Sequence, residues 1–349
     1  MATTIRRMCF DKILPQDLRR AIPFMTIGAG RTRAISPIGK LWVNGSTLRI
    51  RFLGGTQQQH DIVRRYAPQW TQHANLQFDF GNAVDADIRI AFEDDGAWSY
   101  VGTDAKGIHV SQPTMNFGWL DEAVVLHEFG HAIGLAHEHQ NPDGGIRWNE
   151  PVVIRDLSGP PNRWDIATIR HNVLNKYSHD QINGTAFDPK SIMLYSFPAE
   201  WTLDGFHSEP NLTLSDMDEA FVASTQMYPG RGTPPQVVEL AVTEIQATTA
   251  AIGQAGEEDV FTFTARTAGQ YTIETEGETD LMMKLFGPES QTQLITEDDD
   301  SGQGITTASL LISCRASISC RSVTTTAPVA RAYTASRCTS STTTMFKLS

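Results

Sequence analysis

One stretch of eleven residues constrains this 349-residue chain more than any other, and it reads His127-Glu128-Phe129-Gly130-His131-Ala132-Ile133-Gly134-Leu135-Ala136-His137. His127 and His131 are four residues apart, so on a helix their imidazoles lie on one face, one turn apart. That spacing suits two nitrogen ligands of a single zinc ion. Gly134 can take the left-handed conformation that ends a helix, and His137 can then approach the same metal from a new direction.

A catalytic rather than a structural metal site is the better interpretation of this stretch. Three neutral histidines leave a fourth zinc position for water. Glu128 follows the first ligand, and we predict that it sits beside that water as a general base. Any one of these histidines alone would be assigned to the surface, or to a core position where its hydrogen bonds are satisfied. All of them at the required offsets, behind an apolar helical run, favour the metal site.

The stretch resembles the zinc site of the metzincin peptidases, and Glu138 directly after the third histidine is similar to the astacin family among them. Downstream, Ser191-Ile192-Met193-Leu194-Tyr195 resembles the Met-turn of that family. The resemblance implies an endopeptidase with one catalytic Zn²⁺ and a protein or peptide substrate. It also implies that Tyr195 is an extra metal ligand that can swing to stabilise the tetrahedral intermediate. Met193 is expected to pack beneath the ligands.

The resemblance covers residues 40–229, and the pattern of elements there agrees with it. It implies an α+β fold, a metzincin-type zinc protease domain with a twisted mixed sheet plus helices. Alternation predicts short strands, and apolar spacing predicts helices. The predicted strands are Leu41–Val43, Leu48–Phe52, Leu76–Phe80, Ile88–Phe92 and Gly107–Val110, and the predicted helices are Gln57–Ala74, one starting at Asp121, Trp164–Tyr177 and one from Ser215 to near Met227.

A second domain is predicted after a Gly/Pro-rich linker at residues 230–237. Residues 238–311 alternate as strands, and their order is similar to the bacterial pre-peptidase C-terminal (PPC-like) domain, a small β-sandwich. The acidic run Asp298–Asp300 permits a bound Ca²⁺. An acidic turn that only solvates a loop is the favoured interpretation, so calcium is without support.

The tail, residues 312–349, is rich in Ser, Thr, Arg and Cys, has no acidic residue and shows no strand alternation. It is either a disordered low-complexity tail or the product of a shifted reading frame. We prefer the shifted frame, because codons drawn across the residue junctions of Val323–Thr326 permit residues that resemble the missing last strands. The sandwich would then be incomplete. The nucleotide sequence tests this interpretation.

Residues 1–39 are either a pro-segment or an entry strand and helix of the domain, and the sequence leaves both open. No apolar stretch follows Arg6 and Arg7, so no signal peptide is visible, although the resemblance implies an extracellular, secreted protein. No cysteine lies between residues 10 and 313, so the catalytic domain is expected to fold without disulfides. Cys9 is interpreted as a plain free cysteine; a thiolate that covers the zinc in a latent form is the alternative.

Charge and hydropathy exclude other classes of function. The net charge is −12, and residues 236–307 hold 14 acidic against 2 basic side chains, which argues against nucleic-acid binding. No apolar run approaches the roughly eighteen residues of a membrane helix. We interpret the remaining histidines of interest as surface or polar-network residues, namely His109, His139, His171, His179 and His207.

Two competing hypotheses remain. A catalytically silent zinc-binding or adhesive module would be expected to have lost Glu128 or a ligand, and all of them are present. The other competitor is a misfolded product caused by the altered tail. Soluble expression of residues 1–235 alone separates that hypothesis from the endopeptidase.

Overall fold

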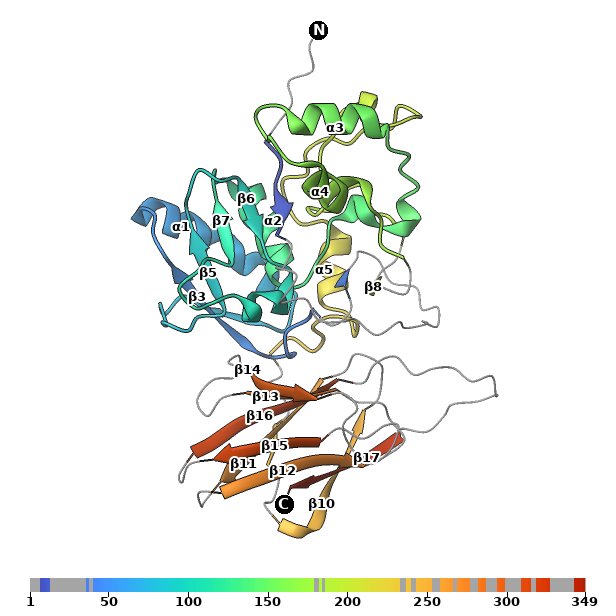
Figure 1. The fold of residues 1–349 in the computed structure, drawn as a ribbon. Helices are drawn as coiled ribbons and strands as arrows, with labels where there is room; N and C mark the ends of the chain where they lie inside the picture. Colours follow the sequence, from blue (N-terminus) through green and yellow to red (C-terminus); the bar gives the residue numbers. More distant parts are fainter. Residues whose placement is uncertain are drawn as a thin grey trace, which may run out of the picture. The chain divides into compact units, whose positions relative to one another are not determined.

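The chain divides into two compact units, described from a computed structural model (Figure 1). The described residues of the first unit are 7–12, 36–37, 40–178, 182–183 and 186–232. Those of the second are the strands at 237–239, 243–252, 258–265, 269–276, 282–286, 294–298, 309–314, 318–326 and 342–348. Each unit is taken by itself below.

The first unit is built on a six-stranded mixed sheet. Its strand order is β1 (Phe10–Asp11), β6 (Ala97–Ser99), β7 (Met115–Phe117), β5 (Ile88–Ala91), β3 (Thr47–Phe52) and β4 (Gln77–Asp79). Strands β6 and β7 pair antiparallel, and the other neighbours pair parallel. Together with the helices below, this confirms the predicted α+β fold with a mixed sheet.

Strand β5 is buried at all four positions, although its alternating sequence predicts one solvated face. Ile88 and Ile90 pack in the main hydrophobic cluster. Arg89 is only 3% exposed, and its guanidinium donates hydrogen bonds to the carbonyl oxygens of Ala86, Ile108 and Gln112 at 2.7–2.9 Å. A buried guanidinium is tolerated when its N–H donors are satisfied in this way. The polarity of Arg89 alone therefore does not show that its face of the strand is exposed to solvent.

Helix α1 (Gln57–Tyr66) starts as predicted, with Thr56 and Gln59 forming a capping box. The predicted helix to Ala74 instead tightens into the 3₁₀ helix η2 (Ala67–Gln72). Pro68 lies at the start of η2 and has no N–H to donate, which explains the change.

Two predicted strands are wrong, and several short strands were missed, among them β6 and β7. Leu41–Val43 is irregular, and the Trp42 N–H donates to the Tyr228 hydroxyl at 3.1 Å. Gly107 ends the 3₁₀ helix η3 (Gly102–Gly107), and residues 108–110 form no strand. Strands β6 and β7 are three residues each, too short for an alternation pattern to reveal.

Helix α2 (Glu122–Ala132) begins where predicted, because the Asp121 side chain accepts a hydrogen bond from the Val124 N–H at 2.9 Å. Val125, Leu126 and Phe129 of this helix are buried in the main hydrophobic cluster. The remaining elements of this unit are η4 (Glu138–Gln140), η5 (Pro142–Gly144), α3 (Glu150–Ser158), α4 (Ile166–Ile169), the π-helix η6 (Arg170–Leu174), the pair β2 (Ser36–Pro37) and β8 (Ile182–Asn183), η7 (Ala199–Trp201) and α5 (Asp216–Val222).

The second unit contains two sheets. One has the order β10 (Thr243–Ile252), β17 (Thr342–Leu348), β12 (Gly269–Glu276) and β15 (Ser309–Cys314). The other has the order β14 (Leu294–Asp298), β13 (Met282–Phe286), β16 (Ile318–Thr326), β11 (Glu258–Ala265) and β9 (Val237–Glu239). The expectation that the chain lacks strands beyond residue 312 is therefore wrong, because β16 and β17 lie there. Threonine and the other β-branched residues of this tail favour extended backbone without any alternation.

Two further expectations bear on the described residues. Of the acidic run considered for calcium, only Asp298 at the end of β14 is described, and the rest lies outside the described residues. In the described part of the chain, none of the helices has the length and apolar character that a membrane crossing needs.

Candidate metal centre

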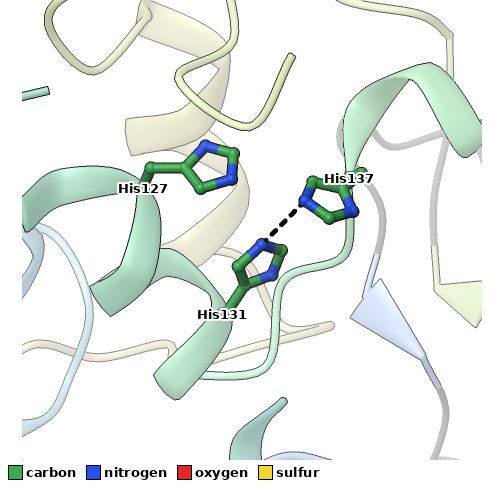
Figure 2. A group of neighbouring side chains, drawn as sticks. All are labelled: His127, His131 and His137. Carbon is green, nitrogen blue, oxygen red and sulfur yellow. Dashed lines mark hydrogen bonds between the residues drawn. The ribbon is translucent and has the colours of Figure 1, made fainter. Parts of the chain in front are cut away.

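Three histidines converge at the end of helix α2 (Figure 2). His127 and His131 lie one turn apart on the helix, and their ring centroids are 4.8 Å apart. His137 comes from the segment after the helix, and its Nε2 is 3.0 Å from the Nε2 of His131. One nitrogen of each ring lies within 4.8 Å of one nitrogen of each other ring. The sequence-predicted ligands are therefore brought together.

The turn that delivers His137 depends on Gly134. This residue has φ +103°, in the region that favours glycine, as the sequence predicts for the residue that ends the helix. The Leu135 N–H donates to the Gly130 carbonyl at 2.9 Å, and the Ser36 hydroxyl donates to the Gly134 carbonyl at 2.7 Å. The chain is thus reversed within three residues and tied to neighbouring backbone.

The protonation of the rings suits a metal. Nδ1 of His127 lies 2.8 Å from the Ile192 carbonyl, and Nδ1 of His131 lies 2.9 Å from the Leu135 carbonyl. A carbonyl oxygen only accepts, so both rings carry their proton on Nδ1 and keep a lone pair on Nε2. Burial lowers the pKa of His127 to about 3 and also lowers the pKa values of His131 and His137, so all three imidazoles are neutral at pH 7.

These residues fit a zinc ion. Among the described residues, the buried Nε2 of His127 has no hydrogen-bond partner. Two nitrogens bound tetrahedrally to one zinc at 2.0–2.1 Å would be about 3.3 Å apart, close to the spacing of the His131 and His137 nitrogens. A cation held by His127, His131 and His137 would explain both the unpartnered Nε2 of His127 and the close approach of the other two Nε2 atoms.

Glu128 lies in the same buried region as the ligands. Its side chain is inaccessible to solvent, and a carboxylate oxygen lies within 4.8 Å of a ring nitrogen of His127. Burial raises the pKa of Glu128 well above its usual value. A carboxyl group with a raised pKa is more basic in its ionised form, which suits a proton acceptor.

Tyr195 covers the ligands from the Met-turn. Its ring centroid is 4.3 Å from that of His137 and 5.9 Å from that of His127. Its hydroxyl donates a hydrogen bond to the backbone carbonyl of Cys9. Burial raises the pKa of Tyr195, so the phenol keeps the proton that it donates. Here the hydroxyl is engaged with a peptide carbonyl at the site.

Met193 fills the space beneath the helix, as the resemblance implies. It is 1% exposed, and a β-carbon at Gly130 would overlap its sulfur. The Met193 carbonyl accepts a hydrogen bond from the Glu138 N–H at 3.0 Å. Glu138 in turn accepts hydrogen bonds from the Asp188 N–H and the Asn141 amide, and burial raises its pKa to about 8. The Met-turn and the segment after the third histidine are thus fastened together.

Sequence reasoning missed Asp218, which holds the Met-turn in place. This buried carboxylate accepts hydrogen bonds from the Ser191 hydroxyl at 2.7 Å and from the Ile192 N–H at 2.8 Å. Burial raises its pKa to about 6. The Ile192 carbonyl is the group that orients His127, so Asp218 acts on the first ligand through the turn. The only signal in the sequence was its place in a capping box with Ser215.

Replacing Asp218 with Asn is expected to weaken zinc binding. The two donors bind different carboxylate oxygens, and asparagine keeps only one of them, so its NH₂ group would face either the Ser191 hydroxyl or the Ile192 N–H. A buried donor left unsatisfied costs about 1–3 kcal/mol. Loss of a group that orients a ligand lowers metal affinity by about 10–100-fold. Competition with a chromogenic chelator measures this affinity. The control is Asp216→Asn, exposed and two residues earlier in the same helix; equal zinc affinity in the two variants would refute the role of Asp218.

Three other histidines match the surface or polar-network interpretation. His139 is buried, donates from Nε2 to the Asn172 carbonyl at 2.7 Å and stacks 4.5 Å from Tyr195. His109 and His207 are exposed. His179 lies outside the described residues.

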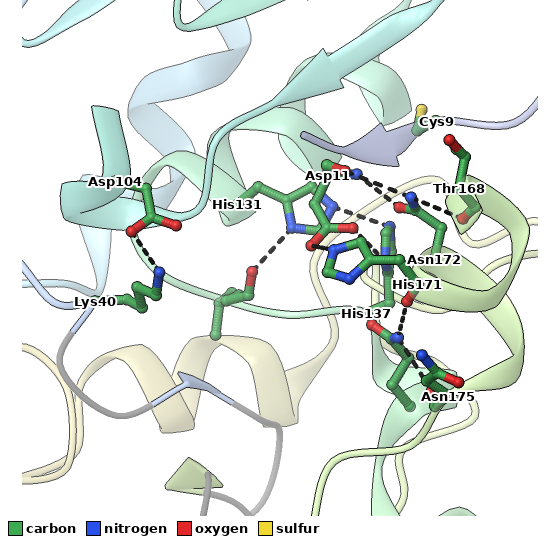
Figure 3. Close-up of polar contacts among 12 residues, drawn as sticks. Cys9, Asp11, Lys40, Asp104, His131, His137, Thr168, His171, Asn172 and Asn175 are labelled. Atoms are coloured by element: carbon green, nitrogen blue, oxygen red, sulfur yellow. Dashed lines mark hydrogen bonds and ion pairs between the residues drawn. The ribbon is translucent and has the colours of Figure 1, made fainter. Parts of the chain in front are cut away.

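The segment Arg7–Lys12 brings Cys9 and Asp11 to the site, and of these two only Asp11 was not considered from the sequence (Figure 3). Asp11 is 3% exposed and pairs with Nε2 of His171 at 3.0 Å, which also agrees with a polar-network role for that histidine. Cys9 forms no disulfide, as expected. Its sulfur lies within 4.8 Å of ligand atoms of both His127 and Glu128.

A neutral three-histidine centre beside a buried carboxylate, on an α+β fold, defines the class of zinc-dependent peptidases. Comparison with known proteins then gives the family. The model of the peptidase family described as Astacin matches residues 35–205. The solved structure of myroilysin is 35% identical, with a TM-score of 0.53, and the match covers 55% of this chain and 98% of that one. The chain belongs to the astacin family.

Curated relatives agree with this assignment over part of their length. Human (Homo sapiens) Tolloid-like protein 1 is 25% identical over 202 residues, which are 55% of this chain and 18% of that protein. Zinc metalloproteinase nas-23 of Caenorhabditis elegans is 28% identical over 142 residues, 40% of this chain and 24% of that protein. The chain thus spans less than a quarter of the length of either relative.

Proposed function

We propose that this chain is a zinc-dependent endopeptidase that hydrolyses peptide bonds in protein or peptide substrates. The observation that carries the proposal is the convergence of His127, His131 and His137 beside the buried carboxylate of Glu128. The three histidines would hold one catalytic Zn²⁺. When bound, zinc acidifies a water molecule and polarises the peptide carbonyl.

The remaining chemistry is assigned to two side chains. Glu128 accepts the proton of the attacking water and returns it to the leaving amine, a role that its burial and raised pKa support. Tyr195 donates a hydrogen bond to the oxygen of the scissile carbonyl as negative charge develops there. Its hydroxyl already donates to one peptide carbonyl at this site, that of Cys9, which supports this role.

We propose the following domain organisation for the chain. Residues 1–39 include a pro-segment, 40–229 form the peptidase domain and 230–237 the linker. Residues 238–311 form a PPC-like β-sandwich; the two sheets of the second unit support a sandwich, although they also include β16 and β17 from beyond residue 311. Residues 312–349 are a tail from a shifted reading frame, and the nucleotide sequence is the test. An extracellular place of action is proposed from the family.

Zinc content and peptide cleavage by the purified chain test the function. We expect about one zinc per chain, and cleavage of a quenched casein peptide after limited proteolysis of the N-terminal segment. A chelator should abolish cleavage, and added zinc should restore it. The same assay on residues 1–235 examines the peptidase unit without the second unit. Cleavage that survives the chelator, or zinc without cleavage as in a silent binding module, would refute the assignment.

A further inference from the structure

We propose that the sheet edge beside the three histidines selects a basic side chain of the substrate, and that Trp98 and Asp95 form the subsite that binds it. The substrate is then an extended peptide that carries Lys or Arg about three residues from the scissile bond. The proposal rests on the proposed peptidase function and adds the specificity of that site. It is carried by the cation of Lys12, which lies against this ring and near this carboxylate.

The edge of the six-stranded sheet passes the metal centre. Strand β1, Phe10–Asp11, is the outermost strand and pairs in parallel with β6. In the same segment, the carbonyl of Cys9 accepts a hydrogen bond from Tyr195, the donor assigned above to the scissile carbonyl. An extended peptide whose carbonyl meets Tyr195 along this edge therefore comes beside the side chains that surround residues 10–12.

Side chains along this edge alternate between two surroundings, as in any strand. Asp11 lies on the face of the histidines, with Oδ1 3.6 Å from Nδ1 of His137. Phe10 and Lys12 lie on the other face, against the hydrophobic cluster that contains Trp98. Lys12 is three residues beyond the carbonyl that meets the tyrosine, which is about 10 Å of extended chain. A substrate side chain at that distance would lie over the same ring.

The ammonium group of Lys12 lies on the face of an indole. Its Nζ is 3.6 Å from the ring centroid of Trp98, well inside the roughly 6 Å over which cations attract aromatic faces. Trp98 is 3% exposed, and its ring meets that of Tyr100 edge to face at 6.1 Å. The indole is thus held in one orientation, and tryptophan is the aromatic side chain that attracts cations most strongly.

A carboxylate completes the subsite. Burial lowers the pKa of Lys12, and the negative charge of Asp95 opposes this shift. The ammonium therefore loses part of its water and is compensated by a ring on one side and by a carboxylate nearby. An uncharged side chain of the same length would gain the apolar contact but neither of these two attractions.

The loop that carries Asp95 is fixed by a buried amide. Asn116 of strand β7 is inaccessible to solvent, and its Nδ2 donates to the backbone carbonyls of Glu93 and Gly96 at 2.9 and 2.7 Å. Its Oδ1 accepts a hydrogen bond from the Glu93 N–H at 2.8 Å. The Gly118 N–H donates to the Gly96 carbonyl at 2.9 Å. A carboxylate on such a loop is preorganised, so little conformational entropy is lost when a cation binds.

The other basic side chain of residues 7–12 makes the same kind of contact. The guanidinium carbon of Arg7 lies 5.8 Å from the ring centroid of Trp119, which comes just before helix α2. Both cations of this segment therefore lie on tryptophan rings, one on each side of Cys9. Two such contacts along one stretch of chain indicate that the edge suits basic peptides.

The simpler interpretation is a surface lysine whose hydrocarbon stem covers an apolar ring while its head stays in water. Two observations oppose it. The nitrogen itself, rather than the stem, lies 3.6 Å from the centre of the Trp98 ring. The ammonium is also partly desolvated, because burial has the largest effect on the pKa of Lys12. This is the contact of a bound cation.

Matched peptides measure the selection on the purified chain, after the limited proteolysis used in the assay above. The two quenched peptides differ only in Lys or norleucine, which has the same four-carbon chain without the ammonium, placed at each position in turn. At one position about two to four residues from the scissile bond, kcat/KM should be about tenfold higher for Lys, the combined effect of a cation–π contact and a screened ion pair. The direction in which the peptide runs decides the side of the bond.

Variants assign this selection to the two side chains, because the Lys/norleucine ratio cancels any general change in turnover. Asp95→Asn should lower the ratio by about two- to fivefold, and Asp95→Lys should lower it further by like-charge repulsion. Trp98→Leu keeps an apolar side chain without a π face and should lower the ratio by about fivefold. Asp94→Asn makes the same chemical change at the neighbouring exposed position and should keep the wild-type ratio.

A binding measurement distinguishes this proposal from the proposed function. Fluorescence anisotropy of the labelled peptides on Glu128→Gln gives Kd with little cleavage, and the Lys peptide should bind about tenfold more tightly. Cleavage with equal kcat/KM for both peptides at every position, or an unchanged ratio in Asp95→Asn, overturns the subsite and leaves the peptidase standing. Lys-selective binding by a chain that cleaves nothing supports the subsite and overturns the peptidase function. A chain that neither cleaves nor binds either peptide overturns both.

Discussion

Replacing Glu128 with Gln is expected to leave one zinc bound and to lower kcat by roughly 10²–10⁴-fold, the usual contribution of general acid–base catalysis. Glutamine keeps the volume of the buried side chain, so the helix and the three histidines should remain in place. It has no proton-accepting carboxylate, so the attacking water is not activated and the leaving amine is not protonated. Zinc content by elemental analysis and kcat on a quenched peptide, both after limited proteolysis, measure the two parts of this result.

The control for this variant is Glu93→Gln, which makes the same chemical change at an exposed position. It should retain both zinc and full turnover. If Glu128→Gln cleaved the peptide at the wild-type rate, the proton-transfer role would be lost; if it bound no zinc, the carboxylate would have a structural role instead.

Replacing Gly134 with Ala is expected to destabilise the peptidase unit by about 2–4 kcal/mol. Left-handed backbone costs an L-residue about 1–2 kcal/mol, and overpacking by the new methyl group adds the rest. The φ of Gly134 is +103°, and a β-carbon would lie 2.9 Å from Cδ2 of Leu41. Relief of either strain moves the turn that carries His137, so zinc affinity should fall as well. Thermal unfolding and chelator competition measure the two effects.

Gly205→Ala is the matched control for that substitution. Gly205 also has a positive φ, +78°, but nothing lies within 4 Å of the position that its β-carbon would take. The free energy of unfolding of this variant should fall only by the cost of left-handed backbone, about 1 kcal/mol, and its zinc affinity should be unchanged. An equal loss of zinc in both variants would show that the turn at Gly134 has no special role in placing His137.

The metal ligands could be predicted because they lie within eleven residues and follow helical geometry. His127, His131, Gly134 and His137 are related by local backbone rules alone, and the start of helix α2 at Asp121 follows from its cap. The resemblance added residues far along the chain, of which Tyr195 does lie beside the ligands.

The rest of the site could not be predicted because it depends on contacts distant in sequence. Cys9 and His127 are 118 residues apart, and nothing around Cys9 in the sequence indicates where it packs. Asp218 lies 26 residues from Ile192, and its capping box predicts a helix start rather than a link to a metal ligand. Arg89 illustrates the same limit in the fold, because its burial depends on carbonyls of a loop about 20 residues away.

The bond from Asp218 to the Met-turn has a consequence for how the centre is assembled during synthesis. All three imidazoles have been translated by residue 137, yet the carbonyl that orients the first of them belongs to Ile192, whose N–H is held by a carboxylate at 218. A nascent chain that ends before helix α5 carries every ligand without the framework that aims them. A chain that has not yet added Asp218 should therefore bind zinc as weakly as the Asp218→Asn variant. Zinc is best retained after the last helix of the unit is translated.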